Sequence, residues 1–308
     1  MERNILSKND ACYEKRFRHK LNLLEPGLVV IRAVALPLAA GGISLLPQWM
    51  LLAQRGDGKK NNKKGEEENI MLKIEHLTKS YGEKKAVDNL SLHIAPGEIY
   101  GFIGHNGAGK TTTLKSVVGI QQFDQGEIFV GGVSMQKDPL ACKKQLAYIP
   151  DNPDLYEYMT GIQFLNFIAD IFGISVQERQ ERIRNYADRF ELTDDLAQSI
   201  AAYSHGMKQK LAIIAAWIHQ PKLIVMDEPF VGLDPKAAHL LKGMMREICD
   251  QGGAIFFSTH VLEVAEKLCD KIAIIKAGRL IRFGTMEEVK GDDSLEDVFL
   301  ELEGEEEC

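Results

Sequence analysis

Three near-continuous apolar segments stand out along the chain, at residues 98–103, 222–227 and 254–259. Their length and continuity are typical of strands that are buried on both faces of a parallel sheet. Residues 162–172 and 176–192 have apolar side chains at helical spacing instead, and residues 271–284 have the pattern of two strands about a glycine turn. The chain therefore predicts an α/β fold.

A glycine-rich loop follows the first of these strands and precedes a predicted helix that starts at Thr112. The loop consists of Gly104, His105, Asn106, Gly107, Ala108, Gly109, Lys110 and Thr111, which is the pattern G-x-x-x-x-G-K-[ST]. Glycines allow backbone N–H groups to close around phosphate oxygens, and the helix N-terminus adds positive potential. Lys110 would neutralise the outer phosphates, and the Thr111 hydroxyl would ligate Mg²⁺. The loop predicts a phosphate-binding site.

Acidic and histidine side chains follow the other two predicted strands. Asp227 and Glu228 end the segment 222–227, and His260 follows the segment 254–259. Open α/β sheets bind ligands at the carboxyl ends of their strands, so these side chains are expected near the glycine loop. Asp227 would hold Mg²⁺, largely through water, and Glu228 would be the general base that polarises the attacking water. His260 would donate a hydrogen bond to a γ-phosphate.

A further motif, Tyr203-Ser204-His205-Gly206-Met207-Lys208-Gln209-Lys210, lies between the glycine loop and the Asp-Glu pair. It resembles the signature motif of ATP-binding cassette (ABC) ATPases, usually written L-S-G-G-Q. The resemblance covers about residues 71–302. The other motifs of the family are matched in order and spacing by Tyr81 (the aromatic residue that stacks on adenine), residues 104–111 (Walker A), Asp227-Glu228 (Walker B), Asp234 (D-loop) and His260 (switch histidine).

The resemblance implies a P-loop NTPase with a RecA-like core, an antiparallel β-subdomain formed mainly by N-terminal strands, and an inserted helical subdomain at about residues 152–220. It also implies a dimer, with a second copy or a paralogue. Each ATP would lie between the Walker A loop of one subunit and the signature of the other, where Ser204 and the N–H of Gly206 would meet the γ-phosphate. The chain would then be a cytoplasmic ATP hydrolase, peripheral on the inner face of the cell membrane. It would drive a separate multi-span permease, and the substituted signature resembles that of ABC-2-type exporters.

Three positions depart from the family pattern. Asp151 stands where the family has the Q-loop glutamine; it could ligate Mg²⁺ directly or through water, and it would add negative charge near the γ-phosphate. His205 and Met207 replace the first glycine and the glutamine of the signature. Histidine changes charge near neutral pH, so His205 either adds a pH-sensitive phosphate contact or points into solvent.

Residues 151–161 would join the core to the helical subdomain and, by resemblance, receive the coupling helix of a membrane subunit. Tyr156 and Tyr158 are expected to be exposed for that contact, whereas Phe164 and Phe167 are expected in the core of the subdomain. Residues 294–302 resemble the closing helix of exporter ATPases. Residues 303–308 are predicted to be an acidic, disordered tail.

The composition is that of an ordinary globular protein: of 308 residues, 45% are hydrophobic and 26% are charged. Residues 1–70 hold 12 basic and 8 acidic side chains, whereas residues 71–308 hold 25 and 36. An acidic body argues against nucleic acid as a partner. The five cysteines lack metal-ligand or redox spacing, which favours a reducing cytosol. The alternative function is a soluble ABC ATPase that remodels a ribosome or another macromolecular complex; the acidic body and the single cassette disfavour it.

Residues 1–70 differ from the rest of the chain. Ala33 to Gln54 carry no charge and are long enough to span a bilayer, yet two prolines and two glycines weaken any helix there. A membrane anchor, a disordered extension and a segment that is not normally translated are the three alternatives. We expect the last, with Met71 as the start, because Met71 leads directly into a strand pattern.

Overall fold

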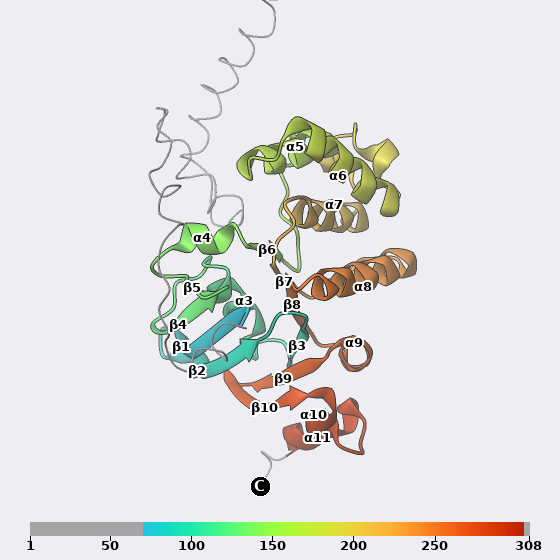
Figure 1. Ribbon diagram of the computed structural model, residues 1–308. Helices are drawn as coiled ribbons and strands as arrows, with labels where there is room; N and C mark the ends of the chain where they lie inside the picture. The colour runs from blue at the N-terminus through green and yellow to red at the C-terminus, as the bar shows by residue number, and fades with distance from the viewer. Residues whose placement is uncertain (1–69, 305–308) are drawn as a thin grey trace, which may run out of the picture.

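A six-stranded, mostly parallel sheet forms the centre of the computed structural model, which describes residues 70–304 (Figure 1). The strand order is β10-β9-β3-β8-β7-β6, and β10 is antiparallel to β9. Every residue of β3, β7 and β8 is buried, which explains why these strands appear as continuous apolar runs. The strands are β3 (Ile99–Ile103), β6 (Leu146–Ile149), β7 (Leu223–Asp227), β8 (Ala254–Thr259), β9 (Lys271–Lys276) and β10 (Arg279–Thr285).

A second, antiparallel sheet has the order β2-β1-β4-β5. It consists of β1 (Leu72–Tyr81), β2 (Lys84–Ile94), β4 (Gln125–Val130) and β5 (Val133–Ser134). Helix α3 (Lys110–Val117) lies between this sheet and the central one, and apolar side chains from all three elements form one buried cluster that includes Leu77, Phe102 and Leu114. The predicted antiparallel β-subdomain and α/β core are therefore confirmed.

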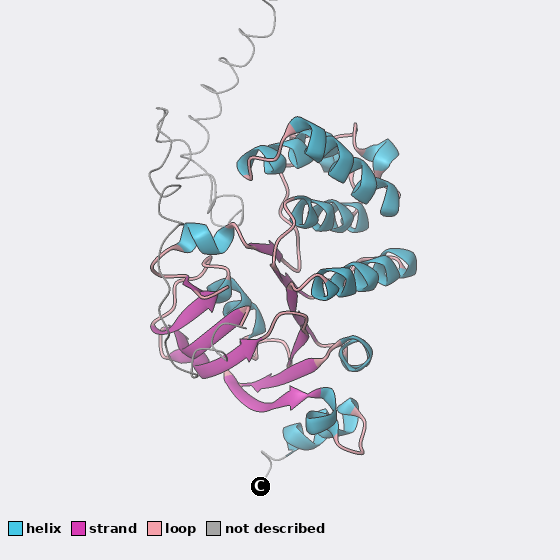
Figure 2. Cartoon of the chain, viewed as in Figure 1, coloured by secondary structure: helices cyan, strands magenta, loops and turns pink. Residues whose placement is uncertain are grey.

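Three helices lie together on the other side of the central sheet, inserted between β6 and β7 (Figure 2). They are α5 (Gly161–Ile171), α6 (Val176–Arg189) and α7 (His205–Ile218), with short 3₁₀ turns at Thr193–Asp195 and Ile200–Ala202. Capping boxes at Thr160 and Ser175 begin α5 and α6. Helix α6 ends before the predicted residue 192, because Glu191 has a left-handed backbone (φ 55°) that cannot continue a helix.

Of the two tyrosines just before α5, one is buried and the other is exposed. Tyr158 is 67% exposed, as predicted, but Tyr156 is only 9% exposed. The expectation for Tyr156 is wrong because its ring packs against Phe164 and Phe167 at centroid distances of 6.3 and 5.8 Å. Phe164 is buried as predicted, and Phe167 is partly buried against the same core.

The remaining helices are α4 (Pro139–Lys143), α8 (Pro235–Asp250), α9 (Leu262–Leu268), α10 (Met286–Lys290) and α11 (Leu295–Gly304). Helix α11 continues through residues 303 and 304, so the predicted tail 303–308 begins two residues too early. The rest of that tail, and the three alternatives for the N-terminal extension, lie outside the described residues apart from Ile70. Within residues 70–304, no helix combines the length and apolar character needed to cross a bilayer.

Candidate ATP site

Backbone packing explains the glycines of the loop between β3 and α3. A Cβ atom on Gly104 would lie 2.4 Å from the carbonyl oxygen of Ile275, and one on Gly109 would lie 2.3 Å from that of Ala86. Gly107 and Gly109 also have positive φ values, 84° and 112°. Any side chain at Gly109 would therefore be both clashing and strained. The loop leads directly into α3, and the first N–H groups of a helix have no carbonyl partner within it.

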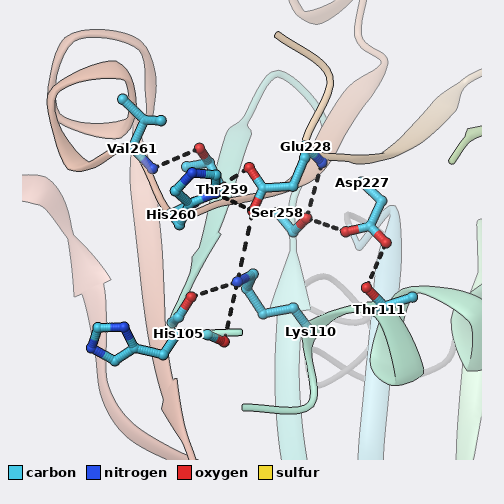
Figure 3. Close-up of polar contacts among 10 residues, drawn as sticks. His105, Lys110, Thr111, Asp227, Glu228, Ser258, Thr259, His260 and Val261 are labelled. Carbon is cyan, nitrogen blue, oxygen red and sulfur yellow. Dashed lines mark hydrogen bonds and ion pairs between the residues drawn. The ribbon is translucent and has the colours of Figure 1, made fainter. Parts of the chain in front are cut away.

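Lys110 is buried, with 6% exposure, and its ammonium lies at the centre of the site (Figure 3). Its Nζ donates to the carbonyl oxygens of Gly104, at 2.5 Å, and His105, at 3.3 Å. It also lies 3.7 Å from Oε1 of Glu228. A lysine held by loop carbonyls and a carboxylate can turn toward phosphate oxygens, because its flexible stem carries a compact charge.

Thr111 and Asp227 bring two oxygen donors together. The Thr111 hydroxyl donates to one carboxylate oxygen of Asp227 at 2.6 Å, and the Ser258 hydroxyl donates to the other at 2.5 Å. Ser258 is not among the site residues that the sequence predicts. Ser258 reaches Asp227 because the two residues are direct neighbours in the register of the paired strands β7 and β8. Spacing along the sequence does not reveal this pairing.

Glu228 and His260 meet beside Lys110. Nδ1 of His260 lies 2.9 Å from Oε1 of Glu228, and the backbone N–H of His260 donates to Oε2 at 3.4 Å. Glu228 has φ 47°, and its N–H bonds to the Ser258 carbonyl oxygen and hydroxyl, both at 3.2 Å. A non-glycine residue in this conformation stores strain that the surrounding bonds must hold, as is common at functional sites.

A cavity of about 260 Å³ is lined by Lys110, Thr111, Asp227 and Glu228 together with two more of the predicted residues, Tyr81 and Asp151, whereas Ser258 and His260 are not part of its lining. Tyr81 is 52% exposed at its mouth, with the ammonium of Lys79 5.3 Å from the ring centroid. Burial raises the pKa of Asp151, and the charges of Asp227 and Glu228 raise it further. The cavity is lined by Tyr81, Lys84, Ala86, His105, Asn106, Gly107, Gly109, Lys110, Thr111, Thr112, Asp151, Asp227 and Glu228.

Ser204, Gly206 and Asp234 do not line this cavity. The Ser204 hydroxyl accepts a bond from the Met207 N–H at 3.3 Å and caps α7. Asp234 caps α8 through the Ala237 N–H at 2.8 Å and pairs with Lys210 at 2.8 Å, and the bond from Lys210 is the main cause that lowers the Asp234 pKa.

The signature turn instead packs on the D-loop. A Cβ atom on Gly232, which has φ 79°, would lie 2.4 Å from Cδ2 of His205, and a Cβ on Gly206 would lie 2.8 Å from the Gly232 carbonyl oxygen. The ring of His205 thus lies against Gly232 rather than only in solvent.

Comparison with known proteins decides the family. The model of the family described as ABC transporter matches residues 87–231. The ABC-type transporter ATP-binding protein EcsA of Bacillus subtilis is 35% identical over 237 residues, covering 75% of this chain and 96% of its own length. The chain belongs to the ABC transporter ATP-binding proteins.

Two further relatives agree. The linearmycin resistance ATP-binding protein LnrL of B. subtilis is 34% identical over 215 residues, covering 70% of this chain and 69% of its own length. A solved structure of an ATP-binding subunit of an ABC transporter superposes with a TM-score of 0.73 at 34% identity, covering 76% of this chain and 99% of that one. This ABC protein therefore has the P-loop NTPase fold of the family, binds ATP and hydrolyses it, which confirms the expected family, fold and activity.

Proposed function

We propose that this ABC ATPase works as a dimer that hydrolyses two ATP molecules and drives export through a separate multi-span permease. The observation that carries the proposal is that the Walker A and Walker B residues line a cavity from which the signature residues are absent. Residues 105–107, 109–112, 151 and 227–228 line one cavity, whereas Ser204 and Gly206 lie outside it, at the exposed start of α7. A signature presented outward is suited to the nucleotide of a second subunit, whether a copy or a paralogue.

In the proposed function, most side chains of the cavity have a role. Residues 104–112 would surround the phosphates with N–H groups, Lys110 would neutralise their outer oxygens, and Tyr81 would stack on adenine. Thr111 and Asp227, already within hydrogen-bond distance, offer the hard oxygen ligands that Mg²⁺ takes, and Asp151 lines the same cavity. When bound, Mg²⁺ would supply charge neutralisation at the phosphates.

Glu228 would accept the proton of the attacking water, and His260 would bond to the γ-phosphate. Nδ1 of His260 lies 2.9 Å from Oε1 of Glu228, so this contact must open when His260 turns toward phosphate. The ammonium of Lys110 lies 3.7 Å from Oε1 of the same carboxylate. Ser204 and Gly206 from the partner would close the site, with Asp234 at the same interface.

A membrane partner would dock on the helical subdomain, residues 152–220 of the ATPase domain 71–302. Tyr158 is an exposed aromatic residue braced by Tyr156, with ring centroids 5.5 Å apart. Large rigid aromatic side chains are favoured in such contacts. We place the protein in the cytoplasm, on the inner face of the membrane. The substituted signature, and a relative named for resistance to linearmycin, support export.

The test is to trap the ATP-bound dimer and identify its partner. The full chain carrying Glu228→Gln is expressed in its own host, membranes are solubilised with Mg-ATP, and co-purifying proteins are identified and quantified. We expect a stoichiometric multi-span membrane protein. The double variant Lys110→Ala/Glu228→Gln is the control, because it should lose ATP-dependent capture. Tyr158→Ala should weaken capture without reducing ATP binding. Recovery of ribosomes, or of soluble proteins alone, contradicts the exporter and supports the alternative remodelling ATPase.

A further inference from the structure

The ring of His105 lies outside the group that surrounds Lys110. Figure 3 shows the ring pointing away from Lys110, while the His105 carbonyl oxygen faces it. The ring lies against Phe299 of α11, with centroids 4.9 Å apart and planes at 54°. The phosphate-binding loop is therefore in direct side-chain contact with the last helix of the described chain.

Phe299 itself is held by rigid neighbours. Leu295 and Val298 of the same helix are buried in the main core, and Lys276 of β9 donates from Nζ to the carbonyl oxygen of Leu302 at 3.1 Å. Strand β9 also carries Ile275, whose carbonyl oxygen lies where a side chain on Gly104 would be. Helix α11 and the glycine loop are thus attached to the same strand, which fixes where the Phe299 ring stands.

The middle of the loop differs from its two ends in how it is supported. Towards α3, the loop is tied to the backbone: the Gly278 N–H donates to the Ala108 carbonyl oxygen at 2.9 Å, and Gly109 packs on Ala86. Along residues 105–107, the loop borders a second cavity, of about 510 Å³, which Phe299 and Leu302 also line. A loop beside such a space has room to shift, so a ring contact at His105 restrains it.

We propose that Phe299 is a positioning residue for ATP binding, acting through its contact with the His105 ring. By holding the loop in its phosphate-binding shape before ATP arrives, it reduces the ordering cost of binding. Turnover of ATP already bound depends on Glu228 and its neighbours, which Phe299 does not touch. Loss of the ring should therefore affect the affinity for ATP more than the rate of hydrolysis.

The experiment measures equilibrium binding of a fluorescent ATP analogue, together with KM and kcat, on the full chain. We expect Phe299→Ala to weaken binding and raise KM by about fivefold, the order that an aromatic pair contributes, with kcat changed by less than about twofold. Phe299→Tyr keeps the ring and should bind like the wild type. Leu300→Ala, on the same helix at a position 59% exposed, is the matched control and should also bind normally.

A double-variant cycle tests the route through His105. If Phe299 acts on the loop through that ring, Phe299→Ala should weaken binding little further in the His105→Ala background. Equal, additive losses in the two backgrounds, or wild-type binding by Phe299→Ala, overturn the proposal. Should Phe299→Ala fail to fold, Phe299→Leu replaces it: the proposal requires Leu to bind ATP more weakly than Tyr at this position, and equal binding by the two refutes it.

Discussion

The cavity of the α/β core and the signature turn at the start of α7 are both built from glycines packed against backbone, yet their polar side chains are in different situations. Around the cavity, the side chains of Lys110, Asp227 and Glu228 are largely buried: Lys110 lies beside Glu228, and Asp227 accepts a hydrogen bond from Thr111, which is itself exposed. At the signature, Ser204 caps its own helix and is exposed. In the proposed dimer, one subunit would thus contain the groups that carry out hydrolysis, whereas its own signature would contact only the ATP of the second subunit.

The largest expected effect lies in the core. Glu228→Gln keeps the shape of the side chain but cannot accept a proton, so we expect ATP hydrolysis to fall by about 10²- to 10³-fold while ATP binding persists. Steady-state hydrolysis and equilibrium binding measure the two effects. Glu263→Gln, an exposed carboxylate on α9 paired with Lys267, is the control and should hydrolyse ATP normally. Loss of less than about threefold in Glu228→Gln would remove the general base from the mechanism.

The next largest effect concerns His219, which connects the helical subdomain with the central sheet. His219 follows α7; its ring stacks on Phe172 at 3.7 Å, and Nε2 lies 3.2 Å from the Leu146 carbonyl oxygen of β6. Burial lowers its pKa from 6.5 to about 4, helped by the charge of Arg182. Above pH 6.5 the His219 imidazole is neutral in both the folded and the unfolded state. As the pH falls, the unfolded chain binds the proton first, so stability is lost between pH 6.5 and 4.

We expect this one histidine to account for about 3 kcal/mol of unfolding free energy over that range. Denaturant unfolding at several pH values measures it, and the difference between wild type and His219→Gln separates it from the carboxylates that also titrate in acid. The variant should have a flatter pH profile. Parallel profiles for the two proteins would show that His219 is protonated as easily in the folded state as in the unfolded one.

A mixing experiment tests whether the signature acts across a dimer. Lys110→Ala and Ser204→Ala homodimers should each hydrolyse ATP slowly. In an equal mixture, half of the dimers are mixed, and each of these contains one site with both groups intact. We expect hydrolysis to rise above that of either variant, toward about a quarter of the wild-type rate. A mixture that remains at the average of its components would indicate that Ser204 acts in its own subunit.

The features that sequence predicts well are the ones that local pattern determines. The strands before Gly104, Asp227 and His260 are buried on both faces, and this burial produces the continuous apolar segments by which the sequence predicts them. The glycine loop is determined by backbone geometry within a few residues. Two of the missed features depend on contacts between separate elements of the fold. Ser258 meets Asp227 through strand pairing, and Tyr156 is buried by a helix that follows it.

His205 is the sharpest example, because a substitution in the signature could be interpreted either as a new phosphate contact or as a solvent-exposed change. Its ring lies against Gly232, a residue whose positive φ and missing Cβ leave the space. Only the fold brings the two residues together. The same holds for His105 and Phe299, which stand at opposite ends of the ATPase domain in sequence.

The smallest expected effect concerns Asp151, which stands where the family has the Q-loop glutamine. Asp151 lines the cavity beside Asp227 and Glu228, and its raised pKa means that its negative charge is unfavourable there in the absence of a cation. If Asp151 helps to hold Mg²⁺, then Asp151→Asn should raise the Mg²⁺ concentration for half-maximal hydrolysis by a factor of about two to five, with little change at saturation.

The same variant should be slightly more stable at neutral pH without nucleotide, because a carboxylate with a raised pKa favours the folded state only when protonated. Asp154→Asn, an exposed carboxylate of the same segment outside the cavity lining, should change neither quantity. An unchanged Mg²⁺ titration with a changed stability would leave Asp151 as a charge near the site but not as a ligand.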